Sequence, residues 1–234
     1  MARGKYTRRA RPRRSNSCRR RCYKRRTCIV RAPRKRLSTL WPVSQLVKMK
    51  VVFSATNAGT SGALGNYTVA GVNFTDPFSS NSAVQPLGID QWTALYRKGK
   101  AVGCDVRYRL HNKGTTAVMA GITPFPEDET IAPTEWDDYV EFPGTVKRLL
   151  SPDDDTCLLV KRMNTKRWLR VSNVKDEEDL SCTLPHSDSA RDYKLRCWYQ
   201  SLDKSTTNAV ELVIEVTYVV LLYDREFPAR STDA

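Results

Sequence analysis

The chain has 234 residues, which is enough for one sizeable β domain with its own core and an additional tail. Its formal net charge of +14 is uneven, because residues 1–36 hold 17 of the 39 Lys and Arg residues and none of the 25 Asp and Glu residues. The rest of the chain holds 22 basic and 25 acidic residues, which excludes a basic folded body.

Residues 1–36 are expected to be disordered, because so charged a segment cannot offset its ordering entropy by burying apolar surface. Arg outnumbers Lys by 14 to 3, and a guanidinium group binds phosphate through two nitrogens. Neutralising phosphates releases counterions, which gives affinity without a base preference. The segment is therefore a predicted nucleic-acid-binding arm, and its expected contact residues are Arg3, Lys5, Arg8, Arg9, Arg11, Arg13, Arg14, Arg19, Arg20, Arg21, Lys24, Arg25, Arg26, Arg31, Arg34, Lys35 and Arg36.

Three basic runs within the arm also fit nuclear-import signals, namely Arg19–Arg21, Lys24–Arg26 and Arg34–Arg36. The composition changes at Leu37–Pro42, so we expect an arm over residues 1–36 and a β-rich body over residues 37–234. The N-terminus has no apolar region of the kind that secretory signal peptides contain, so no signal peptide is expected.

The body alternates apolar and polar residues with a period of two, which indicates β-strands. The clearest case is Ala209–Tyr223, in which every even position from Val210 to Leu222 is apolar or aromatic. This stretch is too short and too charged to span a bilayer, so no membrane insertion is expected. The other expected strands are Leu46–Ser54, Cys104–Leu110, 115–123, Thr145–Leu150, Cys157–Met163, Arg167–Val171 and Tyr193–Gln200.

The connections between these strands contain few helical signals. Two short helices are expected, Gly88–Arg97 with Asp90 as its cap and Thr134–Val140 with Thr134 as its cap. Residues 54–66 and 75–86 are expected to form long loops, Pro124 to end the strand before it, and Ser201–Asn208 to join the last two strands as a hairpin. Many short strands with long loops favour an all-β antiparallel sandwich or jelly roll.

Catalytic residues are not expected, because an enzyme needs positioned acid–base groups or a nucleophile with its base. His111 and His186 are the only histidines, and each lies in a polar segment without a motif partner. The sequence has no phosphate loop ending in Gly-Lys-Ser/Thr and no Gly-x-Ser-x-Gly motif. We therefore expect no enzyme activity and no cofactor.

Metal binding is not expected either. Cys18, Cys22 and Cys28 are spaced like part of a zinc knuckle but lack a fourth ligand nearby. Reduced thiols are the expected state of the seven cysteines. Four acidic clusters lack the spacing of a calcium loop and are expected to be solvated loops: Glu127–Glu129, Glu135–Glu141, Asp153–Asp155 and Asp176–Asp179.

The charges of the body suggest two further roles. Lys48, Lys50, Arg107 and Arg109 are candidates for a basic face from which the arm leaves, and the alternative is ordinary strand-surface charge paired with Asp or Glu. The acidic loops would contact basic patches on neighbouring copies or keep nucleic acid off the outer surface, in which case they lie away from the exit of the arm.

One segment resembles a known family. Gly88–Arg109 contains Asp-Gln-Trp-x-x-Leu-Tyr, at Asp90–Tyr96, followed by an expected strand, and the chain closes with Tyr-Asp-Arg-Glu-Phe at Tyr223–Phe227. These features, together with the arginine-rich arm and the β body, resemble the capsid proteins of circular Rep-encoding single-stranded DNA viruses, the circovirus-like group. The resemblance is moderately specific over Gly88–Arg109, whereas the arm is a feature of composition that other coat proteins share.

The resemblance implies a single jelly roll of eight strands in two sheets, with about 60 copies forming a closed icosahedral shell around single-stranded DNA. About 60 inward arms of 17 cations would supply about 1000 positive charges, enough for about a kilobase of DNA at one charge per nucleotide. It also implies self-association, contact with host nuclear import receptors, and location in the virion and, during assembly, in the host nucleus.

These expectations define a structural capsid protein that packages circular single-stranded DNA through its arm. The alternative is a cellular nucleic-acid-binding protein of ribosomal or chromatin type with a basic tail, which would be a monomer or a small oligomer. An enzyme acting on nucleic acid is a third alternative, which the lack of catalytic residues disfavours. The host, the cell-surface receptor and the packaging signal are not encoded in any recognisable motif.

Overall fold

The computed structural model describes residues 42–58, 62–78, 84–126, 133–153, 155–184, 189–206 and 209–226. The predicted arm, its boundary with the body at residue 36, and the acidic cluster Glu127–Glu129 lie outside these residues, and so does His186. Within the described residues, the strands are β1 Gln45–Ala58, β2 Gly65–Ala70, β3 Tyr96–Asn112, β4 Val118–Pro126, β5 Val146–Leu150, β6 Asp155–Asn164, β7 Ser181–Thr183, β8 Tyr193–Ser201 and β9 Ala209–Arg225.

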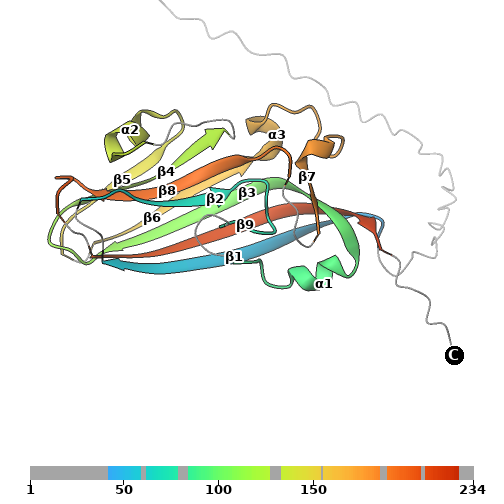
Figure 1. Cartoon of the computed structure of the whole chain (residues 1–234), viewed down its shortest axis with the longest axis horizontal. Coiled ribbons are helices and arrows are strands. Elements are labelled where there is room, and N and C mark those ends of the chain that lie inside the picture. The colour runs from blue at the N-terminus through green and yellow to red at the C-terminus, as the bar shows by residue number, and fades with distance from the viewer. Residues whose placement is uncertain are drawn as a thin grey trace, which may run out of the picture. The chain divides into compact units, whose positions relative to one another are not determined.

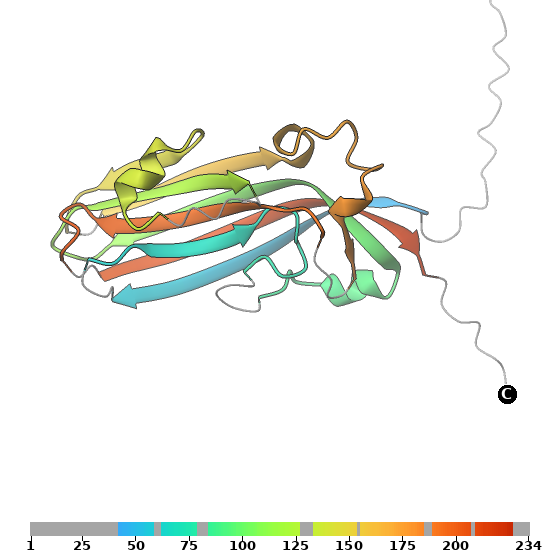
Figure 2. The same cartoon turned by 45° about the horizontal axis from the view of Figure 1, so that its top comes forward.

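The strands form two antiparallel sheets that face each other (Figure 1). One sheet has the order β1-β9-β3-β6, with the short strand β7 paired to β3, and the other has the order β2-β8-β4-β5. Both views show the strands of the two sheets running along the same direction of the body (Figure 2). The predicted all-β sandwich is therefore confirmed.

The pairing identifies the sandwich as a jelly roll. With β7 set aside, the first strand pairs with the last (β1 with β9) and the second with the second-last (β2 with β8). Strands β3 and β6 form the next pair and β4 and β5 the innermost pair. A long antiparallel ribbon wound in this way into two four-stranded sheets is a jelly roll, so the expected eight-stranded arrangement is confirmed.

Strand β9 shows how the sequence pattern builds the core. Its even residues from Val210 to Leu222 are buried between the sheets, and its odd residues stay half-buried on the other side. The strand lies between β1 and β3, so neighbours on both edges shield its outer side chains. The predicted period of two is therefore confirmed.

The predicted hairpin of the last two strands is wrong, because β8 belongs to one sheet and β9 to the other. The connection after Ser201 crosses between the sheets instead of turning within one. Adjacent strands pair in most folds, and the jelly roll is an exception at this position because β8 pairs with β2 and β4.

Three helices of four to six residues occur among the described residues, α1 Ile89–Thr93, α2 Trp136–Glu141 and α3 Thr165–Trp168, with a 3-10 turn η1 at Glu178–Leu180. Both predicted caps are wrong, since α1 begins after Gly88, with φ of 82°, and α2 begins after Glu135. The expected strand Arg167–Val171 is instead α3 and its exit, because the Asn164 side chain accepts a hydrogen bond from the Arg167 backbone N–H and starts a helical turn.

Two further boundaries differ from expectation. Strand β2 begins in the last two residues of the expected loop 54–66 and continues beyond it to Ala70, and β4 continues through Pro124 to Pro126. Pro124 lies beyond the pairing of β4 with β5, which ends at Ile122, so this part of β4 has a single strand neighbour. A proline without an N–H is tolerated there, because only one side of the strand needs its ladder hydrogen bonds.

Candidate nucleic-acid and subunit-contact surfaces

The chain enters the body at the end of the sandwich where β1 and β3 begin and β9 ends, which we call the entry end. Gln45 of β1 pairs with Leu222 of β9, and Leu222 also pairs with Gly99 near the start of β3. Just before β1, the Pro42 carbonyl accepts a hydrogen bond of 2.9 Å from the Tyr96 hydroxyl. The 17 cations of the arm lie outside the described residues, so their binding of nucleic acid stays a prediction.

The four body cations named from the sequence lie on one face. Lys48 and Lys50 are on β1, Arg107 and Arg109 are on β3, and β9 runs between the two strands. The register places all four on the solvent-facing side of β1-β9-β3-β6, and all four are exposed. We call this side the outer sheet face. That it lines the surface from which the arm leaves stays a prediction.

These four cations divide into one that is paired and three that are not. Lys50 Nζ lies 2.8 Å from Glu215 Oε2, and this hydrogen bond is the main cause that holds the pKa of Glu215 below its ordinary value. The charges of Arg109 and Arg107 lower the same pKa further. Neither arginine, nor Lys48, makes an ion pair within 4 Å with any residue that the structure describes. The alternative of paired surface charge therefore holds for Lys50 alone.

The outer sheet face also carries exposed apolar side chains, which were not among the expected site residues. The exposed fraction is 61% for Leu46, 48% for Val52, 50% for Leu158 and 38% for Val160. Their strand positions place them on the same side as the unpaired cations, because alternate residues of a strand point to opposite faces. Leu46 and Val52 lie on the edge strand β1, and Leu158 and Val160 lie on the edge strand β6. Together with the unpaired cations between them, these residues make this face a candidate contact surface.

The outer side of the other sheet differs, because α2 covers part of it (Figure 1). Tyr139 of α2 stacks on Trp198 of β8 with 5.3 Å between ring centroids, and Phe125 completes this small second core. A Cβ at Gly121 would lie 2.4 Å from the Trp198 ring, so only glycine allows the indole to lie flat on the strand. The Trp198 indole N–H donates to the Thr123 hydroxyl at 2.8 Å.

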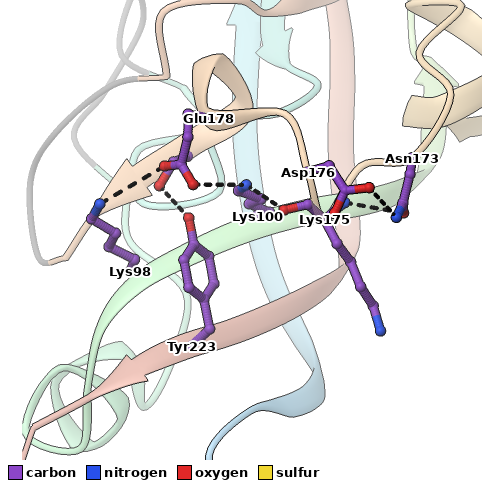
Figure 3. A network of polar contacts seen from close by, with 8 residues as sticks. Lys98, Lys100, Asn173, Lys175, Asp176, Glu178 and Tyr223 are labelled. Carbon is purple, nitrogen blue, oxygen red and sulfur yellow. Dashed lines mark hydrogen bonds and ion pairs between the residues drawn. The ribbon is translucent and has the colours of Figure 1, made fainter.

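The acidic cluster Asp176–Asp179 lies at the entry end, next to the short strand β7 that pairs with the start of β3. Glu178 lies 3.8 Å from Lys98 and 3.7 Å from Lys100, both near the start of β3 (Figure 3). The adjoining Tyr96 is the residue that binds the Pro42 carbonyl. Glu178 therefore serves as a counter-ion for Lys98 and Lys100 of β3. The separation of the acidic loops from the exit of the arm stays a prediction, because the arm lies outside the described residues.

Lys100 is the buried centre of this network. Its side chain is 1% exposed, and its ammonium group donates to the Lys175 carbonyl at 2.8 Å and lies 5.1 Å above the centroid of the Tyr223 ring. The Glu178 side chain is 70% exposed and stays solvated, so Lys100 is the partner of this ion pair that loses its contact with water. The aliphatic stem of Lys100 therefore contributes packing that a surface lysine would not.

Replacing Lys100 with Ala is expected to reduce the free energy of unfolding by about 2–4 kcal/mol, because the substitution empties a buried volume and removes the donor to the Lys175 carbonyl. Lys100→Met keeps the unbranched stem and is expected to cost only about 1 kcal/mol. Urea unfolding followed by tryptophan fluorescence measures both. Equal losses in the two variants would show that the polar contacts outweigh the packing.

The structure describes one of the two histidines and four of the seven cysteines. His111 Nδ1 lies 3.7 Å from Glu211 Oε2 on β9, and no group of three potential metal ligands occurs in the described part of the chain. Cys104, Cys157, Cys182 and Cys197 are buried and are not joined in disulfides. Burial raises the pKa of the Cys104, Cys157 and Cys197 thiols, which disfavours the reactive thiolate.

The strand pairing places the chain in the class of jelly-roll sandwiches. No protein-family model matches the sequence, and no curated protein matches it. No helix among the described ranges is long and apolar enough to cross a membrane.

Several solved structures are similar to the chain. The 60-mer BFDV capsid protein is 11% identical and has a TM-score of 0.47, and the match covers 81% of this chain and 98% of that one. Desmodium yellow mottle tymovirus is 14% identical with a TM-score of 0.43, over 80% of this chain and 92% of that one. The semi-empty VLP of the nodavirus of the giant freshwater prawn Macrobrachium rosenbergii is 10% identical with a TM-score of 0.46, over 80% and 96%. The structural neighbours thus include viral capsid proteins.

Proposed function

We propose that the chain is the coat protein of a circular single-stranded DNA virus of the circovirus-like group, whose body builds an icosahedral shell and whose arm holds the genome. The separation of charge carries this proposal, because 17 cations without a single carboxylate precede a jelly-roll body with 22 basic and 25 acidic residues. A polycation on a slightly acidic body binds DNA through the arm and leaves the body free to contact other copies.

The fold alone does not select this function, because jelly rolls also occur in lectins and cupins. The arm favours a coat protein over both, since neither sugar binding nor cupin chemistry requires a tail of 17 cations. The inventory of the described residues, which lacks a metal-ligand group, favours a structural role over an enzyme.

The shell requires contacts between copies, and the outer sheet face is suited to one. Three unpaired cations and four exposed apolar residues share this face. Exposed carboxylates such as Asp138 and Glu141 of α2 lie on the opposite sheet and supply complementary charge for a neighbouring copy. We therefore assign the outer sheet face to contact with a second copy of the chain.

The remaining partners follow from the proposed life cycle. The genome is single-stranded DNA, and the basic runs Arg19–Arg21, Lys24–Arg26 and Arg34–Arg36 bind host nuclear import receptors. The protein is then located in the virion and, during assembly, in the host nucleus.

The purified full chain, mixed with circular single-stranded DNA, should form closed particles of uniform size that protect the DNA from nuclease. Light scattering and negative-stain microscopy measure the particles, and a mixture without DNA is the control. A monomer or small oligomer at every salt concentration, with and without DNA, would contradict the proposal and favour a cellular nucleic-acid-binding protein with a basic tail.

A further inference from the structure

A pocket of about 460 Å³ opens where β4 and β6 end, and its walls come from three separate parts of the sequence. Arg167, Trp168 and Arg170 come from α3 and its exit, Arg191 from the segment before β8, and Pro126 from the end of β4. Both views show α3 at the same end of the body at which β1 begins (Figure 1, Figure 2). The pocket therefore lies at the entry end.

Hydrogen bonds fix the main chain from which these side chains project. The turn of α3 is closed by hydrogen bonds from Leu169 N–H to the Thr165 carbonyl at 3.0 Å and from Val171 N–H to the Lys166 carbonyl at 3.2 Å. Arg170 adopts the left-handed conformation, with φ of 54°, which a non-glycine residue rarely adopts. A long cationic side chain thus occupies a position where glycine would fit with less strain.

Arg191 and Trp168 are anchored in a similar way. The Arg191 N–H donates to the Asp179 carbonyl at 3.0 Å, and the half-buried Trp168 ring packs against Tyr193 with 6.3 Å between centroids. One side of the indole is therefore supported by β8, and the ring lines the pocket. Local hydrogen bonds thus fix the main chain that carries the three arginines, and packing against Tyr193 positions the aromatic ring.

The pocket carries an excess of positive charge. Arg167, Arg170 and Arg191 make no ion pair with any residue in the described ranges. Asp192 also lines the pocket, but its Oδ1 accepts backbone N–H groups from Gly71 at 3.1 Å, from Val72 at 2.6 Å and from Tyr193 at 2.7 Å. The pocket is therefore lined by three arginines and by one buried carboxylate that accepts three backbone hydrogen bonds.

We propose that this pocket binds a nucleotide unit of single-stranded DNA, with its phosphate on the three arginines and its base against Trp168. Guanidinium groups bind phosphate oxygens through paired hydrogen bonds, and an aromatic ring stacks on any base. The volume lies within the range of small-ligand pockets. This inference rests on the proposed function, because the arm then delivers the genome to the entry end, where the body holds it at a defined point.

The test is photocrosslinking of the full chain to a short oligothymidylate that carries 5-iododeoxyuridine, with the adducts mapped by mass spectrometry. An adduct is expected on Trp168. In the variant R167Q/R170Q/R191Q its yield should fall about ten-fold or more, since three charge-assisted contacts to phosphate are lost. The matched control K147Q/R148Q/K175Q removes three exposed cations outside the pocket and should leave the yield within about two-fold of the unmodified chain.

Equal yields in the two variants, or adducts confined to other residues, would overturn the pocket as a DNA site. Binding of a sulfated oligosaccharide through the same arginines, without a DNA adduct on Trp168, would also overturn it. Thermal unfolding of both variants verifies that they are folded. Either result against the pocket leaves the proposed function intact if the affinity for DNA still depends on the arm. The proposed function fails separately if a chain with a neutralised arm binds DNA with undiminished affinity.

Discussion

Deleting residues 1–36 should weaken binding of single-stranded DNA by about a thousand-fold or more at low salt. The arm holds 17 cations, and the affinity for a single strand falls with salt at a slope of about −0.7 for each neutralised phosphate. If about eight cations are engaged, raising the salt from about 50 to 200 mM should weaken the intact chain by more than a thousand-fold. The truncated chain should lose most of this salt dependence. Fluorescence anisotropy of a labelled oligothymidylate measures both quantities.

The deletion should leave the body folded, because every core residue of the described structure lies between Met49 and Leu222. The thermal unfolding midpoint is therefore expected to stay unchanged. A chain whose arm arginines are all replaced by Lys is the matched control, and it should keep the salt slope because counterion release depends on charge. Undiminished DNA binding after the deletion would place the main nucleic-acid site in the body.

The period of the hydrophobic pattern predicted most long strands, and it did so because each of them buries one face. β9 is the clearest example, since its alternating residues line the interface between the sheets. The pairing of the strands could not be predicted from this pattern, because the partner of each strand depends on how the whole antiparallel ribbon is wound into two sheets. Adjacent β8 and β9 therefore looked like a hairpin although they belong to different sheets.

Some short elements were not predicted, because local polar groups or pairing with a distant strand determine their backbone conformation. Arg167–Val171 contains residues that favour strands, such as Trp168 and Val171, yet the Asn164 side chain caps a helical turn there. Strand β2 begins with Gly65 and Asn66, which are residues typical of turns, and it is held by pairing with β8. Tertiary pairing thus outweighs the weak strand propensity of these residues.

The surfaces were partly predictable for the same physical reason. Lys48, Lys50, Arg107 and Arg109 share a face because strand parity and antiparallel pairing align them. Their ion pairs depend on the neighbours that β9 supplies, so Glu215 could not be matched to Lys50 beforehand. The arginine pocket was not predicted, because its residues come from three segments that only the fold brings together.

Replacing Val52 and Leu158 together with Asp should abolish particle formation and leave the isolated subunit folded. Both side chains are about half exposed on the outer sheet face, so the new carboxylates stay hydrated in a single copy. In a contact between copies they would lose that hydration, which costs several kcal/mol for each unpaired charge. Closed symmetry repeats this cost in every copy of the shell. Light scattering measures the particles, and circular dichroism measures the fold.

Leu87→Asp is the matched control, because Leu87 is 95% exposed and precedes α1 outside the outer sheet face. It adds a carboxylate by the same type of substitution, and particles should still form. Normal particles from the Val52 and Leu158 variant would show that copies meet through other surfaces. Loss of particles in that variant alone would assign the contact to the outer sheet face. In such a contact the exposed apolar residues become buried, and the unpaired cations meet the acidic loops of a neighbouring copy.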